Sequence, residues 1–312
     1  MIKLGEISGD LKKEFFDSVK DEYIELLKAN SSNSKYDKIT KFFSATATYV
    51  DENRVKSVLI GEIDQLEFAA GEIKKIKRGK GAGEPQYDFN ILYGNFTAKL
   101  GHELTDRMGV KVCPYCNRAY IHTLKRKKVR PQYDHFFNKA DYPYLAISLY
   151  NLIPSCGVCN LAKGAYDTFD ASTKMRKFIY PYRDEYGYDI KFAIENCKDE
   201  VRTLLGVSEE FDIAIDVSNA DANLKTRANN AIYKLNLTDL YNKHKDYVAN
   251  ILRLRYIYDD SFLDALKNKF SSIFSSKSDL KSTLYLNYLT KDKWGGRILS
   301  KLTYDIVQEY KH

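Results

Sequence analysis

The sequence predicts an α+β fold in which a small insertion of short strands is carried by a mainly helical body. Near both ends of the 312-residue chain, apolar side chains recur every three or four residues, the period of an amphipathic helix. Between about 110 and 170 this period is lost, and short apolar pieces alternate with Cys, Pro, Asn and Gly. Around 209–217 apolar and polar residues alternate one by one, which indicates a strand.

The first predicted region, 1–109, carries three apolar stripes of helical period. They consist of Leu11, Phe15, Val19, Tyr23 and Leu27, then of Leu59, Ile63, Leu66, Ala70 and Ile73, and then of Phe89, Leu92, Phe96, Leu100, Leu104 and Met108. The basic, turn-rich stretch KKIKRGKGAGEP at 74–85 separates the last two stripes, and we expect it to be an exposed loop.

The third predicted region, 171–312, begins with strands and ends with helices. The aromatic stretch KFIYPYRDEYGYDIKFAI predicts a hairpin or two strands, and EEFDIAIDV at 209–217 predicts another strand. Thr238 can cap a helix that carries Val248 and Leu252 on one face, and Leu302 and Ile306 predict a final helix.

The composition excludes several classes of protein. Hydrophobic residues make up 44% of the chain and aromatic residues 13%, which is enough for a core and excludes general disorder. No apolar run approaches the roughly 20 residues that a membrane span needs. The opening residues MIKLGEISGDLKKEFF contain no apolar segment of the kind that signal peptides have. We therefore expect a cytoplasmic protein that has no contact with a membrane.

The five cysteines point to a metal site. Cys113-Pro-Tyr-Cys116 and Cys156-Gly-Val-Cys159 are two CxxC pairs, and an odd total without a signal peptide argues against a disulfide framework. Four thiolates form a tetrahedral set that suits a structural Zn²⁺ and leave no open position for catalysis. Cys197 remains, and we expect it to be a partly buried thiol.

Positive charge is concentrated around these pairs. The whole chain has a formal net charge of +7, and residues 113–167 contain eight Lys or Arg against three Asp. Such a stretch can bind the phosphates of a nucleic acid without recognising its base sequence. Away from these cysteine pairs, a basic stretch of this kind would be interpreted as a solvated loop. The candidates for nucleic-acid binding are Arg118, Lys125, Arg126, Lys127, Lys128 and Arg130, and the stretch 74–80 is a second candidate.

The polar residues between and beside the cysteine pairs complete a motif. The pieces, in order, are Cys113xxCys116, Asp134-His135, Asn151-Leu152 and Cys156xxCys159-Asn160xxLys163. This string resembles the HNH nucleases, the ββα-metal family, in the form stapled by two CxxC knuckles. The resemblance covers residues 110–170, the second predicted region, and implies a small ββα-metal core with a structural zinc inserted in the helical body.

The resemblance also implies residue roles in phosphodiester hydrolysis. His135 would be the general base, for which an imidazole pKa near neutrality is suitable. Asp134 and Asn160 would be the ligands of a catalytic Mg²⁺ or Mn²⁺. Asn160 stands where the family often has His, and its amide oxygen still suits a hard ion. Asn151 would orient the base through the backbone, and Lys163 either contacts the scissile phosphate or is solvated.

A looser resemblance extends to HNH proteins of bacterial anti-phage systems such as the nuclease subunit of Septu. It implies DNA as the substrate and a separate ATPase subunit as a partner, since this chain has no GxxxxGK[ST] phosphate-binding loop. Two alternatives remain open at this point. The first is a nuclease that acts on RNA or tRNA, and the second is a zinc-stapled nucleic-acid-binding module that does not cut.

Overall fold

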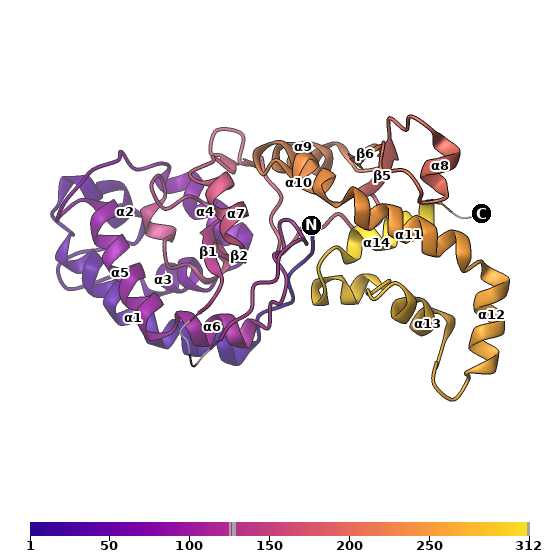
Figure 1. Cartoon of the computed structure of the whole chain (residues 1–312). Helices are drawn as coiled ribbons and strands as arrows, with labels where there is room; N and C mark the ends of the chain where they lie inside the picture. Colours follow the sequence, from indigo (N-terminus) through magenta and orange to yellow (C-terminus); the bar gives the residue numbers. More distant parts are fainter. Residues whose placement is uncertain (125, 127–128, 311–312) are drawn as a thin grey trace. The chain divides into compact units, whose positions relative to one another are not determined.

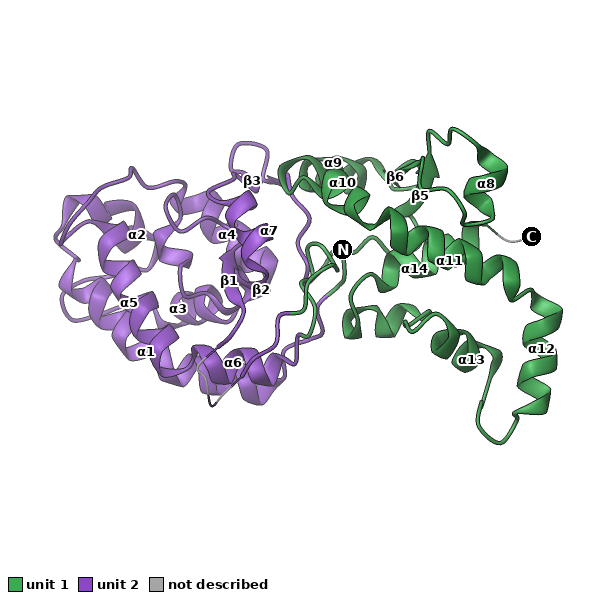
Figure 2. Ribbon diagram, viewed as in Figure 1, with its two compact units in different colours: residues 1–3, 111–120, 183–312 green, residues 4–110, 121–182 purple. Residues whose placement is uncertain are grey.

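The computed structural model describes residues 1–124, 126 and 129–310, which divide into two compact units (Figure 2). Unit 1 comprises residues 1–3, 111–120 and 183–312, and unit 2 comprises residues 4–110 and 121–182. The units group the chain differently from the three predicted regions, because residues 121–170 pack with the N-terminal helices. Helices dominate both units and are accompanied by two-stranded antiparallel sheets, so the α+β class is confirmed.

Unit 2 consists of helices followed by a short ββα segment (Figure 1). Its helices are α1 (Gly9–Ala29), α2 (Asp37–Phe42), α3 (Glu52–Leu59), α4 (Ile63–Ile73), α5 (Pro85–Lys99), α6 (Gly101–Met108) and α7 (Gly157–Lys163). Its strands are β1 (Gln132–His135), β2 (Leu152–Ser155), β3 (Phe169–Asp170) and β4 (Met175–Arg176), with 3₁₀ turns η1 (Ser34–Tyr36), η3 (Pro143–Leu145) and η4 (Leu149–Asn151).

Aromatic side chains connect the helices of unit 2 to the strands. Tyr23 is fully buried on α1, packs against Phe89 of α5 at 5.4 Å between ring centroids, and donates its hydroxyl to the carbonyl of Tyr144 at 2.9 Å. Phe96 of α5 lies 6.3 Å from the ring of Tyr133 in β1. The helical body therefore fixes both β1 and the segment between β1 and β2.

The first predicted stripe is confirmed, and the other two are interrupted. All five apolar residues of the first stripe are buried on α1. The second stripe breaks at Gly61, where a Cβ would lie 2.0 Å from the carbonyl oxygen of Ser57, so the chain can turn there only with glycine. The third stripe breaks at Leu100, which separates α5 from α6.

Unit 1 combines one antiparallel pair of strands with the C-terminal helices. The strands β5 (Lys191–Glu195) and β6 (Asp212–Asp216) pair in the register Lys191↔Asp216. The helices are α8 (Glu200–Leu204), α9 (Ala222–Lys234), α10 (Leu237–Tyr241), α11 (Lys245–Ile257), α12 (Asp260–Lys269), α13 (Lys277–Leu284) and α14 (Ser300–Glu309), with 3₁₀ turns η5 (Asn242–His244) and η6 (Lys291–Gly296).

The strand predicted at 209–217 is confirmed as β6, whereas the aromatic stretch before it is a strand only over β5. The prediction that Thr238 caps a helix is wrong. The helix α10 begins at Leu237 after Asn236, which has a φ of 52°, and it ends before η5. Among the described residues, no helix has both the length and the apolar character that crossing a membrane requires.

Candidate functional site

The candidate site is formed by β1, β2 and α7. The strands pair antiparallel, with Asp134 opposite Ile153 and His135 opposite Leu152. Helix α7 begins directly after β2, and the Sγ of Cys156 accepts a hydrogen bond from the backbone N–H of Cys159 as its N-cap. Two short strands and one helix thus bring the Asp-His pair next to the residues that follow the second CxxC pair.

Asp134 and Lys163 form an ion pair inside unit 2. The Lys163 ammonium donates to Asp134 Oδ1 at 3.0 Å and to the carbonyl oxygen of His135 at 2.7 Å. The lysine is 0% exposed and the aspartate is 2% exposed. The alternative that Lys163 is solvated is therefore wrong. Lys163 lies one helical turn after Asn160. Its side chain points into unit 2 and fixes the carboxylate of Asp134.

His135 is held as a neutral imidazole. Its Nε2 lies 2.9 Å from the carbonyl oxygen of Ala146, so Nε2 carries the proton and Nδ1 keeps the lone pair. Burial, with a further contribution from the positive charge of Lys139, lowers the pKa of His135 from 6.5 to about 3. An anion bound to Lys139 would cancel that second contribution and raise the pKa again.

The segment directly after the Asp-His pair is fixed by hydrogen bonds. Asn151 is fully buried, and its Oδ1 accepts from the Phe137 N–H at 2.7 Å while its Nδ2 donates to the carbonyls of Phe137 and Leu145. The backbone carbonyl of Asn151 accepts from the Phe136 N–H, and the carbonyl of Phe136 accepts from Thr168 at 2.6 Å. Asn151 therefore fixes the backbone that directly follows the Asp134-His135 pair.

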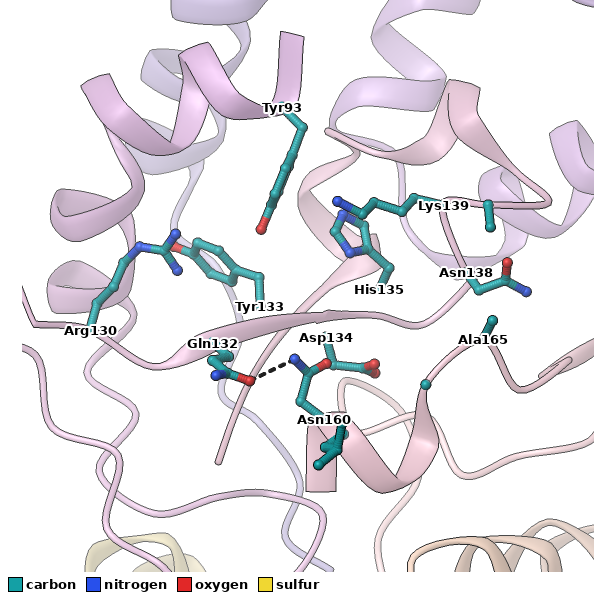
Figure 3. A pocket seen from close by; sticks show the side chains of 13 residues that line it. Tyr93, Arg130, Gln132, Tyr133, Asp134, His135, Asn138, Lys139, Asn160 and Ala165 are labelled. Atoms are coloured by element: carbon teal, nitrogen blue, oxygen red, sulfur yellow. Dashed lines mark hydrogen bonds between the residues drawn. The ribbon is translucent and has the colours of Figure 1, made fainter. Parts of the chain in front are cut away.

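Asp134, His135 and Asn160 line one cavity of about 540 Å³ within unit 2 (Figure 3). The Asn160 Nδ2 donates to Gln132 Oε1 at 2.7 Å, and its amide oxygen lies on the side of Asp134. His135 projects from the other face of β1 toward Tyr93, as expected for neighbours on a strand. The lining of the cavity therefore includes a carboxylate, an amide oxygen and a neutral imidazole.

Sequence reasoning missed Tyr93 as a member of this site. Tyr93 is contributed by α5, about 40 residues before β1, and its ring packs edge-on against His135 at 4.8 Å. The ammonium of Lys139 lies 4.7 Å from the centre of the Tyr93 ring. Lys139 is one of the eight basic residues between 113 and 167, but no sequence motif includes Lys139 or Tyr93.

The two CxxC pairs come together as predicted. The sulfurs of Cys113, Cys116, Cys156 and Cys159 all lie within 4.8 Å of one another and could hold a metal ion such as zinc. Four cysteine sulfurs are the ligand set of many structural zinc sites, in which the ion is bound tetrahedrally. The Sγ of Cys116 accepts a hydrogen bond from the Arg118 N–H at 3.4 Å.

The predicted phosphate-binding residues have different surroundings. Arg130 lines the cavity, and Arg126 is exposed. Arg118 donates its Nε to His244 Nε2 at 3.0 Å within unit 1. In the 74–80 stretch, Lys75 and Arg78 are paired with aspartates. Three predicted residues lie outside the described part of the chain, namely Lys125, Lys127 and Lys128.

The buried ion pair predicts a large effect on stability. Lys163→Met should lower the free energy of unfolding by about 3–5 kcal/mol, because it leaves the buried Asp134 carboxylate without its cation. Adding Asp134→Asn should restore most of the loss. Urea unfolding without added divalent metal measures both variants.

Lys177→Met is the matched control, since it removes a half-exposed lysine paired with Asp167 at 2.7 Å. Its cost should stay below about 1 kcal/mol. If Lys163→Met unfolds at the same urea concentration as the wild type, the pair contributes nothing to the fold.

Comparison with known proteins adds no relative: no family model matches the chain, and no curated protein or solved structure matches it.

Proposed function

We propose that this protein is a metal-dependent HNH-type endonuclease that hydrolyses phosphodiester bonds in DNA. The observation that carries the proposal is the shared cavity, which is lined by Asp134 and His135 from β1 and by Asn160 from α7. These are the residues to which the resemblance assigns catalytic roles, and they line one cavity although 25 residues separate His135 from Asn160 in the sequence.

The donor set of the cavity fits a hard divalent ion. Asp134 offers a carboxylate and Asn160 an amide oxygen, the ligand types that Mg²⁺ or Mn²⁺ prefers. The bond from Asn160 Nδ2 to Gln132 keeps the amide oxygen on the side of Asp134. Bound there, Mg²⁺ would supply positive charge to stabilise the departing 3′-oxygen.

His135 would take a proton from the attacking water once a bound phosphate at Lys139 raises the imidazole pKa above the value of about 3 that burial and Lys139 set. A general base must have a lone pair available, and the bond from Nε2 to Ala146 leaves that lone pair on Nδ1. Asn151 holds the backbone directly after His135, so the imidazole keeps its place relative to the cavity. Lys163 holds the Asp134 carboxylate and is a positioning residue.

The cysteine cluster would hold a structural zinc, separate from the catalytic ion. A set of four thiolates leaves no position for water or substrate, and sulfur ligands select Zn²⁺ over Mg²⁺. The biological setting we propose is anti-phage defence, in which a separate ATPase subunit controls the nuclease. This part of the proposal depends on the looser resemblance to the Septu nuclease subunit.

One assay separates the candidate functions. Purified protein is incubated with Mg²⁺ and, in parallel, with supercoiled plasmid, single-stranded DNA and tRNA. The proposal predicts that DNA is cut. Cleavage of tRNA alone would point to an RNA nuclease, and binding without cleavage of any substrate would point to a nucleic-acid-binding module.

A further inference from the structure

Two cations of the cavity have no acidic partner. Lys139 and Arg130 both line it, and neither makes an ion pair with a described carboxylate within 4.0 Å. Lys139 is partly buried, and burial lowers the pKa of its ammonium. A partly buried cation without a counterion costs free energy, which a bound anion would offset.

Each of these two side chains makes a cation–π contact with a tyrosine ring. The ammonium of Lys139 lies 4.7 Å from the centre of the Tyr93 ring, and the guanidinium of Arg130 lies 4.7 Å from the centre of the Tyr133 ring. In Figure 3, Tyr93 lies between Arg130 and Lys139. Burial raises the pKa of the Tyr93 phenol, and the charge of Arg130 partly offsets that rise. The rings thus place two positive charges on two sides of one cavity.

The charges of the site favour a ligand with more than one negative charge. Asp134 is the carboxylate among the cavity-lining residues, and Lys163 already neutralises it. The positive charges of Arg130 and Lys139 therefore remain uncompensated even before a divalent ion is counted. A single phosphodiester carries one negative charge, whereas a nucleic-acid strand carries one at every nucleotide.

We propose that Lys139 and Arg130 bind the two backbone phosphates that neighbour the scissile one, so that the substrate is a strand with phosphates on both sides of the cut. This inference rests on the proposed nuclease function and names the substrate class of the same site. Because the faces of Tyr93 and Tyr133 carry the cations, these rings hold the cations and do not stack on bases. The contacts are made to phosphates, which carry no sequence information.

Binding of a fluorescently labelled oligothymidylate without Mg²⁺ tests the two subsites directly. Lys139→Met and Arg130→Met should each weaken binding about 10-fold or more, since each removes a charge-assisted contact. Each should also reduce the slope of log affinity against log salt by about 0.7. Lys13→Met is the control, because it removes an exposed lysine of α1 that does not line the cavity.

A small diester provides the second arm. Bis(4-nitrophenyl) phosphate has a phosphodiester but no neighbouring phosphates, so Lys139→Met should lower kcat/KM about 10-fold more on the oligonucleotide than on this probe. Lys139→Arg should retain most of the oligonucleotide affinity. Lys139→Gln replaces Lys139→Met if the latter melts at a lower temperature than the wild type.

The outcomes separate the inference from the function on which it rests. If the wild type cuts DNA but the two variants bind the oligonucleotide as tightly as it does, the subsites are wrong and the nuclease proposal stands. An equal loss of kcat/KM on both substrates places Lys139 at the scissile phosphate and overturns the inference. A wild type that neither binds nor cuts nucleic acid overturns both.

Discussion

His135→Ala is expected to lose about 10²–10⁴-fold of the DNA cleavage rate, the usual cost of removing a general base. The imidazole is neutral, and Nδ1 keeps its lone pair because Nε2 donates to Ala146. Zinc content and DNA affinity should stay at the wild-type level, because the side chain has no part in the cysteine cluster. Single-turnover plasmid nicking measures the rate, and elemental analysis measures the zinc.

His244→Ala is the matched control for this prediction. His244 is also partly buried and accepts a hydrogen bond from Arg118, but it belongs to unit 1 and does not line the cavity. Its removal should leave the cleavage rate unchanged. His135→Gln repeats the test with less loss of volume if the alanine variant proves unstable. Cleavage at the wild-type rate by both His135 variants would show that another group takes the proton.

Substitution of a cluster cysteine is expected to have the largest effect on the fold. Cys113→Ser and Cys156→Ser should each lose zinc and become sensitive to protease, because metal-binding energy at a structural site is also folding energy. In zinc-finger peptides that energy is about 10–16 kcal/mol at neutral pH. Cleavage should disappear together with the fold, in contrast to the clean catalytic loss of His135→Ala.

Cys197→Ser provides the control, since Cys197 is not one of the four clustered cysteines. It should keep one zinc per chain and the wild-type pattern of proteolysis. The wild-type protein itself can contradict the account. If it is folded, resists protease and contains almost no zinc when it is purified without added metal, the cluster is not a structural zinc site.

The sequence predicted helices well where a stripe decides the structure locally and poorly where a tertiary contact decides it. The apolar stripe of α1 was sufficient to predict that helix and its buried face, and its five apolar residues are buried. The chain around Asn242 behaves differently. Its Oδ1 accepts from the Ile213 N–H at 2.9 Å and its Nδ2 donates to the Ile213 carbonyl at 3.0 Å, which ties η5 to β6. No local sequence pattern predicts these hydrogen bonds, because Asn242 and Ile213 are far apart in the sequence.

The candidate site shows the same division. The resemblance assigned catalytic roles to Asp134, His135 and Asn160, and these three residues line one cavity. It did not predict the surroundings that determine their chemistry. Lys163 was expected at the surface or at a phosphate, but its ammonium is buried against Asp134. Tyr93 comes from a helix outside the motif, and only packing brings its ring to His135.

The central claim is that this cavity hydrolyses phosphodiesters with a hard divalent ion while the cysteines hold a separate zinc. Its most direct test is the Mg²⁺ dependence of plasmid nicking by the wild-type protein, with the bound zinc measured in the same samples. We expect nicking with Mg²⁺, none in a mild chelator, and recovery when Mg²⁺ is restored, with one zinc per chain throughout. Nicking that continues at full rate in the chelator, or no cleavage of DNA at any Mg²⁺ concentration, would contradict the claim.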